Sequence, residues 1–235
     1  MKIAIMGTAP TKVAAPFADQ SWTIWACSPG NMDLPRIDRF YEMHHPDLLA
    51  TNADVTSGPF REWLGKRITR GESTVAAYPF GIFAGADVYP VERMLEKFGA
   101  NFFSSSIAYM LAHAISTLDQ DTPEREIGVW GVDMASEGEQ YSFQREGCLH
   151  FLDVARMAGI KVTLPAGSRL LDPSPMYGYG QSHPVYCATV DERNKLERIV
   201  GELEKSIASL SEQRRERIGQ IEALKFVQAR FMAGR

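Results

Sequence analysis

Histidines are the side chains in this sequence best suited to moving a proton near neutral pH. His44 ends the apolar run 39–44, and His183 lies in the segment 173–184, which is rich in Pro, Gly and Tyr. A neutral imidazole can remove the proton from a reacting hydroxyl. Because neighbouring residues of a strand point in opposite directions, only one of His44 and His45 is expected to face a site. A surface loop position for the pair is the alternative.

Residues 7–12 have the residue types of a phosphate-binding loop. They follow the apolar run 2–6, and Gly7 permits a ligand to approach the backbone closely. Thr8 and Thr11 offer hydroxyls, while the start of a following helix offers free amides and a positive dipole end. The segment is neither a Walker loop nor G-x-G-x-x-G, so a tight turn capped by threonine is the alternative.

Other polar residues stand where predicted strands end or predicted helices begin. These are Ser28, Ser105, Ser106, Asp133 and Gln144. Ligands of an open parallel sheet bind beyond the carboxyl ends of its strands, so we expect these side chains at one crevice. The serines and Asp133 have a simpler interpretation, since serines cap helices and Ser28 and Asp133 can form turns without binding anything.

Strands and helices that alternate along the chain must position these residues. We predict strands at 2–6, 22–27, 39–44, 73–78, 126–133 and 160–165, and helices at 12–19, 60–67, 91–98, 104–118 and 145–158. Strand–helix–strand units form parallel sheets. The sequence therefore predicts an α/β fold, with a Rossmann-like, mostly parallel sheet and flanking helices, as a nucleotide-binding domain over residues 1–188.

The pattern changes in the C-terminal part, 189–235. Apolar residues there fall close to a heptad repeat, from Leu196 to Phe231, and Arg214 and Arg217 interrupt it. So narrow a stripe must pack against something. We predict an oligomerisation helix, either a coiled coil between protomers or a helical hairpin, with packing on the sheet of the same chain as the alternative.

Composition excludes several other classes of protein. The chain has 235 residues and a formal net charge of −4, which argues against duplex nucleic acid as a partner. No apolar run is long enough for a membrane span, and the N-terminus does not look like a signal peptide. Three widely separated cysteines favour neither a disulfide framework nor a metal site. We expect a cytoplasmic protein.

Three short motifs within residues 1–170 resemble one superfamily. They are a strand followed by Gly-x-x-Pro-Thr, the helix start at residues 105–108, and a strand closing at residues 131–134. The superfamily includes bacterial sialyltransferases, the motility-accessory flagellin glycosyltransferases and 6-hydroxymethylpterin diphosphokinase-like proteins. The chain is also similar to phage and prophage proteins with the same succession of motifs, which would place it in a host cytoplasm.

The resemblance implies a role for several of these residues. It places nucleotide phosphates, often those of a CMP-sugar, at Gly7, Thr8, Pro10, Ser105 and Ser106, with Asp133 near the nucleotide. By analogy with sialyltransferases, His183 would be the catalytic histidine. The family loop usually reads Gly-x-Gly-Pro-Ser, and here alanine stands in place of the second glycine, which puts transfer activity in question.

Together these observations predict a glycosyltransferase-like enzyme that uses a CMP- or UDP-type nucleotide sugar. His44 or His183 would deprotonate the acceptor hydroxyl. The resemblance to sialyltransferases implies that a divalent metal is not required, although Asp133 is able to bind one such as Mg²⁺. The alternative is a non-catalytic phage-type protein that binds or sequesters a nucleotide or a nucleotide-derived signal. A diphosphokinase would need ATP, magnesium and a clearer carboxylate cluster.

Overall fold

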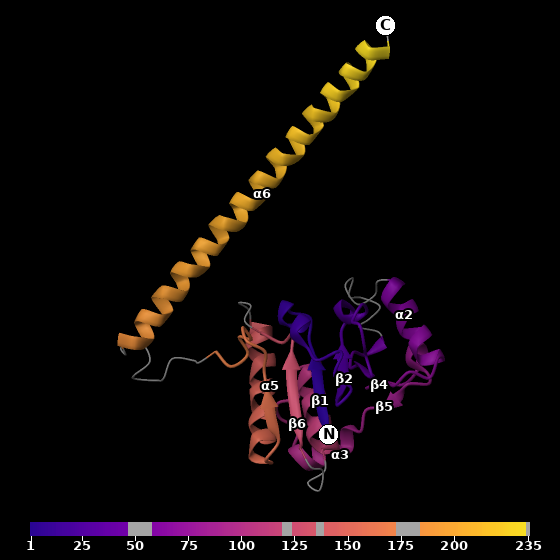
Figure 1. Cartoon of the computed structure of the whole chain (residues 1–235). Coiled ribbons are helices and arrows are strands. Elements are labelled where there is room, and N and C mark those ends of the chain that lie inside the picture. The colour runs from indigo at the N-terminus through magenta and orange to yellow at the C-terminus, as the bar shows by residue number, and fades with distance from the viewer. Residues whose placement is uncertain (47–57, 119–123, 135–138, 173–183, 234–235) are drawn as a thin grey trace. The chain divides into compact units, whose positions relative to one another are not determined.

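The computed structural model describes residues 1–46, 58–118, 124–134, 139–172 and 184–233 (Figure 1). Contacts divide the chain into two compact units, Met1–Asp172 and Pro173–Arg235. The first unit holds the sheet, and the second holds helix α6 (Pro184–Ala233). The boundary that the sequence predicts, between 188 and 189, falls inside α6.

The first unit is built on one parallel sheet of seven strands. They are β1 (Lys2–Met6), β2 (Trp22–Cys27), β3 (Arg39–Glu42), β4 (Thr74–Ala76), β5 (Asp87–Val88), β6 (Glu126–Trp130) and β7 (Lys161–Thr163). Their order is β5-β4-β3-β2-β1-β6-β7, and every neighbouring pair is parallel. This confirms the predicted α/β fold. The chain runs outward from β1 to β5 and then crosses to β6, so the order reverses between β1 and β6.

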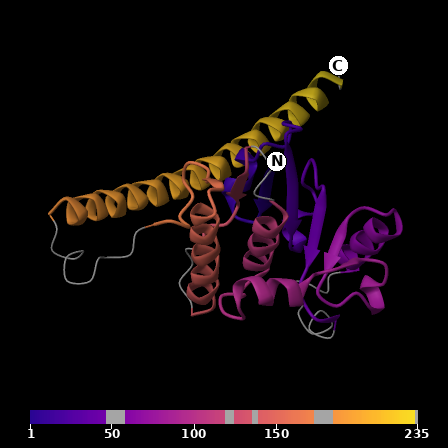
Figure 2. The same cartoon turned by 90° about the horizontal axis from the view of Figure 1, so that it is seen from below.

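Helices cover both faces of this sheet. One face packs against α3 (Val91–Phe98), α4 (Ser106–Thr117) and α5 (Glu139–Met157), and the other against α2 (Gly58–Thr69) and the short 3₁₀ helix η3 (Gly81–Phe83). Figure 2 shows this layering along the edge of the sheet. A sheet covered on both faces requires strands that are apolar throughout, as the short runs in the sequence are.

Successive side chains of β1 point to opposite faces of the sheet, and the hydrophobic core is divided between these two faces. Ile3 and Ile5 belong to the cluster on the α4 side, and Ala4 and Met6 belong to the cluster on the α2 side. All four side chains are fully buried. β1 lies between β2 and β6 and is therefore held on both edges and both faces. The loop that follows β1 consequently starts from a rigid anchor.

Several element predictions need correction. The helix predicted at 12–19 is wrong: only the 3₁₀ helix η1 (Pro10–Ala14) forms, because Pro16 lacks an N–H and forces extended backbone at Ala15. The strand predicted at 126–133 ends at Trp130, where Gly131 takes a φ of +69°. Strand β5 falls in a segment expected to be irregular, and its two residues are exposed, so no apolar pattern marks it.

Helix α6 is continuous over Pro184–Ala233, so the predicted helical hairpin is wrong and the single long helix is right. Lys195 pairs with Glu192 at 3.6 Å and Lys225 with Glu222 at 2.9 Å along its surface. Such i,i+3 pairs support a long helix. Among the described residues, no helix is long and apolar enough to cross a membrane.

Candidate functional site

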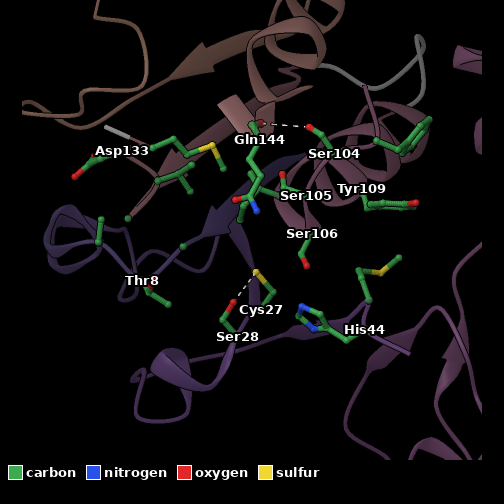
Figure 3. A pocket seen from close by; sticks show the side chains of 18 of the residues that line it. Thr8, Cys27, Ser28, His44, Ser104, Ser105, Ser106, Tyr109, Asp133 and Gln144 are labelled. Carbon is green, nitrogen blue, oxygen red and sulfur yellow. Dashed lines mark hydrogen bonds between the residues drawn. The ribbon is translucent and has the colours of Figure 1, made fainter. Parts of the chain in front are cut away.

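A cavity of about 780 Å³ opens at the carboxyl ends of the central strands. Its walls come from the loops after β1, β2, β3 and β6 and from the start of α4 (Figure 3). It lies where the strand order reverses, the usual ligand position in an open α/β sheet. The predicted site residues that line it are Gly7, Thr8, Pro10, Ser28, His44, Ser105, Ser106, Asp133 and Gln144.

Two glycines allow the loops after β1 and β6 to touch at the base of the cavity. A Cβ on Gly7 would lie 2.2 Å from the carbonyl oxygen of Gly131, and a Cβ on Gly131 would lie 2.5 Å from that of Gly7. The backbone amides of Gly7 and Ala9 donate across this contact to Trp130 and Gly131, both at 2.8 Å. Gly7 therefore matters first for this crossing, which fixes the cavity floor.

Thr11 has a different place from the one the sequence predicts. It lies outside the cavity lining, and its Oγ1 accepts the amide of Gly131 at 3.1 Å and donates to Oδ1 of Asp133 at 3.3 Å. Thr11 thus joins the two loops from behind the cavity. Asp133 lines the cavity, but one of its carboxylate oxygens is used in this link.

The start of α4 presents free backbone donors to the cavity. Ser105 is the N-cap residue, as predicted for this serine cluster, and its Oγ accepts the amide of Ala108 at 3.1 Å. The amides of Ser106 and Ile107 lie in the first turn, where no intrahelical acceptor exists. Together with the helix dipole, they form a site suited to an anion.

Three neutral side chains add to this donor surface. Within the described residues, the hydroxyls of Thr8 and Ser106 and the side-chain amide of Gln144 make no hydrogen bond, although all three residues line the cavity. Figure 3 shows the side chains of Gln144 and Ser106 extending into it. Unused polar groups around a concave wall are available to a bound ligand.

The loop after β2 is held in an unusual conformation. Ser28 has a φ of +74°, which is rare for a residue with a side chain. The fully buried Asn31 holds this loop by donating through Nδ2 to the carbonyls of Met6 at 3.2 Å and Cys27 at 2.8 Å. Asn31 thereby ties the ends of β1 and β2 together beneath Ser28. Backbone strain of this kind concentrates at functional sites.

A buried carboxylate supports His44 at the end of β3. Oε1 of Glu42 lies 2.6 Å from Nδ1 of His44 and accepts the backbone amide of His44 at 3.0 Å. The Glu42 side chain is 2% exposed and that of His44 is 45% exposed. With Nδ1 bonded to Glu42, Nε2 is the nitrogen left for the cavity. The bond with Glu42 raises the pKa of His44 above its usual value, although burial opposes the shift.

The side chain of the adjacent His45 lies elsewhere. It does not line the cavity, and its ring lies 4.6 Å from that of Tyr78. Sequence reasoning overlooked Glu42, although the signal was present: residues two apart on a strand share a side, which places Glu42 with His44.

Arg169 is the other residue that sequence reasoning overlooked. It lines the cavity from the loop after β7 and pairs through Nε with Asp172 at 3.1 Å. Arg145 on α5 holds this loop by donating to the carbonyls of Leu170 at 3.1 Å and Asp172 at 2.6 Å. Because the placement depends on α5 packing beside β7, no local pattern marks Arg169 as a site residue.

His183 lies outside the described residues, so its predicted role stays a prediction. The described part of the chain contains no group of three His, Cys, Asp or Glu side chains placed to hold a metal ion. The cavity instead combines a helix N-terminus, neutral donors, one arginine and a carboxylate-bound histidine. This arrangement is able to bind an anionic ligand and to move a proton beside it.

No protein-family model matches the chain, and no curated protein matches it. Two similar solved structures are sialyltransferases. A mutant of the α-2,3/8-sialyltransferase CstII is 16% identical, with a TM-score of 0.47 over 72% of this chain and 84% of that one. The sialyltransferase CST-II in complex with a trisaccharide acceptor and CMP is also 16% identical, with a TM-score of 0.48 over 72% and 83%. The predicted similarity to phage proteins and pterin diphosphokinases stays a prediction.

Proposed function

We propose that this protein is a glycosyltransferase that uses a CMP- or UDP-type nucleotide sugar. One observation carries the proposal: a helix start with free backbone amides and a carboxylate-supported histidine face the same cavity, at the point where the strand order of the sheet reverses. A nucleotide sugar needs both functions, since its phosphate must be held while the acceptor hydroxyl loses a proton.

The phosphate of the donor would bind at the start of α4. The amides of Ser106 and Ile107 and the hydroxyl of Ser106 supply hydrogen bonds, and the Arg169 guanidinium supplies positive charge. Thr8 and Gln144 are placed to contact the rest of the nucleotide. The same donors that hold the phosphate in the ground state would stabilise the additional charge on it as the sugar leaves.

His44 would act as the general base. Its Nε2 takes the proton of the acceptor hydroxyl while that oxygen forms a bond to the anomeric carbon of the sugar. The bond between the anomeric carbon and the phosphate oxygen breaks, and its electron pair leaves with the nucleotide. Glu42 fixes the imidazole through Nδ1 and stabilises the imidazolium that forms.

The test compares two adjacent histidines. Purified protein is incubated with CMP- and UDP-sugars and a mixture of acceptor sugars, and release of free nucleotide is measured. His44→Ala should lower kcat about 10²- to 10⁴-fold, the usual contribution of a general base. His45→Ala is the matched control, because this neighbour lies outside the cavity, and it should retain the wild-type rate.

His183→Ala belongs in the same series because its predicted role is the same. Unchanged turnover in both His44→Ala and His183→Ala would overturn the mechanism. If wild-type protein binds the nucleotide sugar but returns it intact after prolonged incubation, the protein sequesters its ligand instead of transferring the sugar. The missing second glycine of the first loop motivates that second function.

A further inference from the structure

Helix α6 carries an apolar stripe that nothing in the described part of the second unit covers. The stripe residues are separated by alternating steps of four and three from 196 to 210 and keep the same register from 221 to 231. They are Leu196, Val200, Leu203, Ile207, Leu210, Ile221, Leu224 and Phe231, and their exposed fractions run from 51% to 78%. The spacing is that of a heptad repeat with apolar residues at two positions.

The other sides of α6 carry mostly charged and polar residues, and the exposed apolar exceptions are Ile199, Ile218, Phe226 and Val227. Lys195 pairs with Glu192 and Lys225 with Glu222, so charges on these sides are compensated along the helix itself. The four apolar exceptions are scattered, whereas the residues of the stripe recur at heptad spacing, so the stripe is the apolar surface that a long partner would cover. Its occupant must therefore be apolar, narrow and as long as the stripe.

Length identifies the occupant. From Leu196 to Phe231 the stripe extends over about 52 Å at 1.5 Å per residue. A compact unit of the size of Met1–Asp172 has a radius of gyration of about 16 Å and hence a diameter of about 40 Å, which is shorter than the stripe. A second copy of α6 matches the stripe over its whole length.

The residue types select the geometry of the pair. In the heptad register, Val200, Ile207 and Ile221 occupy position a, and leucines occupy position d at 196, 203, 210 and 224. β-Branched residues at a with leucine at d favour two parallel strands. We infer that α6 forms a parallel, in-register, two-stranded coiled coil with a second copy of this chain.

Arg214 and Arg217 fit this arrangement as determinants of register. They occupy positions a and d of the heptad between the two apolar stretches. A basic residue at a single a position fixes register and strand number while lowering stability, and its long stem can reach water. In register, the arginines of the two chains share the same layers. A shift by one heptad would bury them against leucine and isoleucine of the partner.

The first experiment measures the mass of the full-length protein by sedimentation at micromolar concentration. The proposal predicts twice the 26.2 kDa of one chain. Ile207→Glu should produce monomers, whereas the matched control Ser209→Glu, which adds the same charge on the outer side, should remain dimeric. Arg214→Ile should lower the dimer dissociation constant about tenfold or more. A monomeric wild type, or equal behaviour of the two glutamate variants, would overturn the proposal.

The second experiment tests direction. In a Cys187→Ser background, Leu224→Cys places identical positions opposite each other only when the helices are parallel and in register, so mild oxidation should link the two chains. Glu222→Cys, on the outer side, is the control and should not be linked. A dimer that fails to link through Leu224→Cys would show antiparallel or shifted helices. A wild-type protein that stays monomeric and forms a stoichiometric complex with a heterologous protein through α6 would contradict self-association.

Discussion

The two walls of the cavity differ in the chemistry that they offer. On the first wall, which we call the α4 wall, the backbone amides at the start of α4 and the Ser106 hydroxyl are neutral donors without partners among the described residues, and Arg169, from the loop after β7, is exposed enough to reach a ligand. At the end of β3, Glu42 is buried and already bound to His44. One wall is prepared to receive negative charge, and the other is prepared to exchange a proton.

If the proposed function is right, this difference makes ligand binding and proton transfer depend on separate residues. Changes at the α4 wall should act on the affinity for the nucleotide, and changes at the β3 wall should act on kcat and on its pH dependence. A protein that only sequesters a nucleotide would need the first wall and not the second. Each variant below is chosen to affect one wall.

Among the variants that separate the two walls, the one that removes the charge of Glu42 should have the largest effect. In Glu42→Gln, kcat should fall about 10²-fold, because the amide orients the imidazole less well and does not stabilise the imidazolium. His44 must be neutral to accept a proton, so activity falls as pH drops below its pKa. Glu42 raises that pKa, so the acid limb of the kcat profile should move to lower pH in the variant.

We would test this by measuring kcat as a function of pH for three proteins. They are the wild type, Glu42→Gln and the surface variant Glu62→Gln. Glu62 is an exposed carboxylate on α2 that pairs with Lys66, so its variant should keep the wild-type profile. An acid limb that stays in place in Glu42→Gln would show that His44 is not the titrating base.

Loss of Arg169 should act mainly on affinity. Arg169→Ala should raise the dissociation constant for CMP or UMP about 10- to 100-fold, the effect of removing one hydrogen bond to a charged group. Titration calorimetry measures the change. The matched control is Arg156→Ala, which removes a similar exposed arginine–aspartate pair, at 2.9 Å on α5, and should bind normally. Equal affinities for both variants would remove Arg169 from the site.

The glycine crossing beneath the α4 wall should matter for stability. Gly131→Ala should lower the free energy of unfolding by about 1–3 kcal/mol, since it strains a residue with a φ of +69° and places a Cβ 2.5 Å from the carbonyl oxygen of Gly7. Gly65→Ala, in the interior of α2 with open space around it, should raise stability by about 0.5–1 kcal/mol.

Denaturant unfolding curves give both differences. Gly131→Ala and Gly65→Ala should change the free energy of unfolding in opposite directions. If replacing any glycine simply lowered stability, the denaturant midpoints of both variants would fall. A neutral Gly131→Ala would show that the two loops are not held against each other as the structure describes.

The smallest effect should follow removal of divalent metal. One Asp133 oxygen is bonded to Thr11, and the described residues contain no group of three metal-binding side chains around it. Turnover after dialysis against EDTA should equal the untreated rate. If EDTA abolished activity and Mg²⁺ restored it, a metal ion and not the α4 wall would be what stabilises the leaving phosphate.

Local sequence patterns were enough to predict much of this architecture. The apolar runs of β1 and β6 and the serine cap of α4 are visible in the sequence because they depend on neighbouring residues. Glu42 was also within reach, through the period of two along the predicted strand 39–44, which pairs it with His44. The polar strand ends indicated the edge of the sheet at which the cavity opens, since parallel strands bring their carboxyl ends together.

Residues positioned by distant parts of the chain could not be predicted in the same way. The Thr11 hydroxyl points to Gly131 and Asp133, which are far away in the sequence. Arg169 reaches the cavity because Arg145 holds the loop after β7. Both placements depend on the pairing of β6 with β1 and of β7 with β6, and the order of strands in a sheet is a property of the whole fold.

The central claim is that the α4 wall binds a nucleotide through its phosphate, and a thermal-shift comparison tests it most directly. CMP and UMP are compared with cytidine and uridine, which lack the phosphate. A nucleotide at about 100 times its dissociation constant adds about 2.7 kcal/mol, which should raise the Tm by about 5–10 °C in a domain of this size. The account predicts this rise with CMP or UMP and none with either nucleoside. Equal shifts with nucleotide and nucleoside, or none with any of the four, would contradict it.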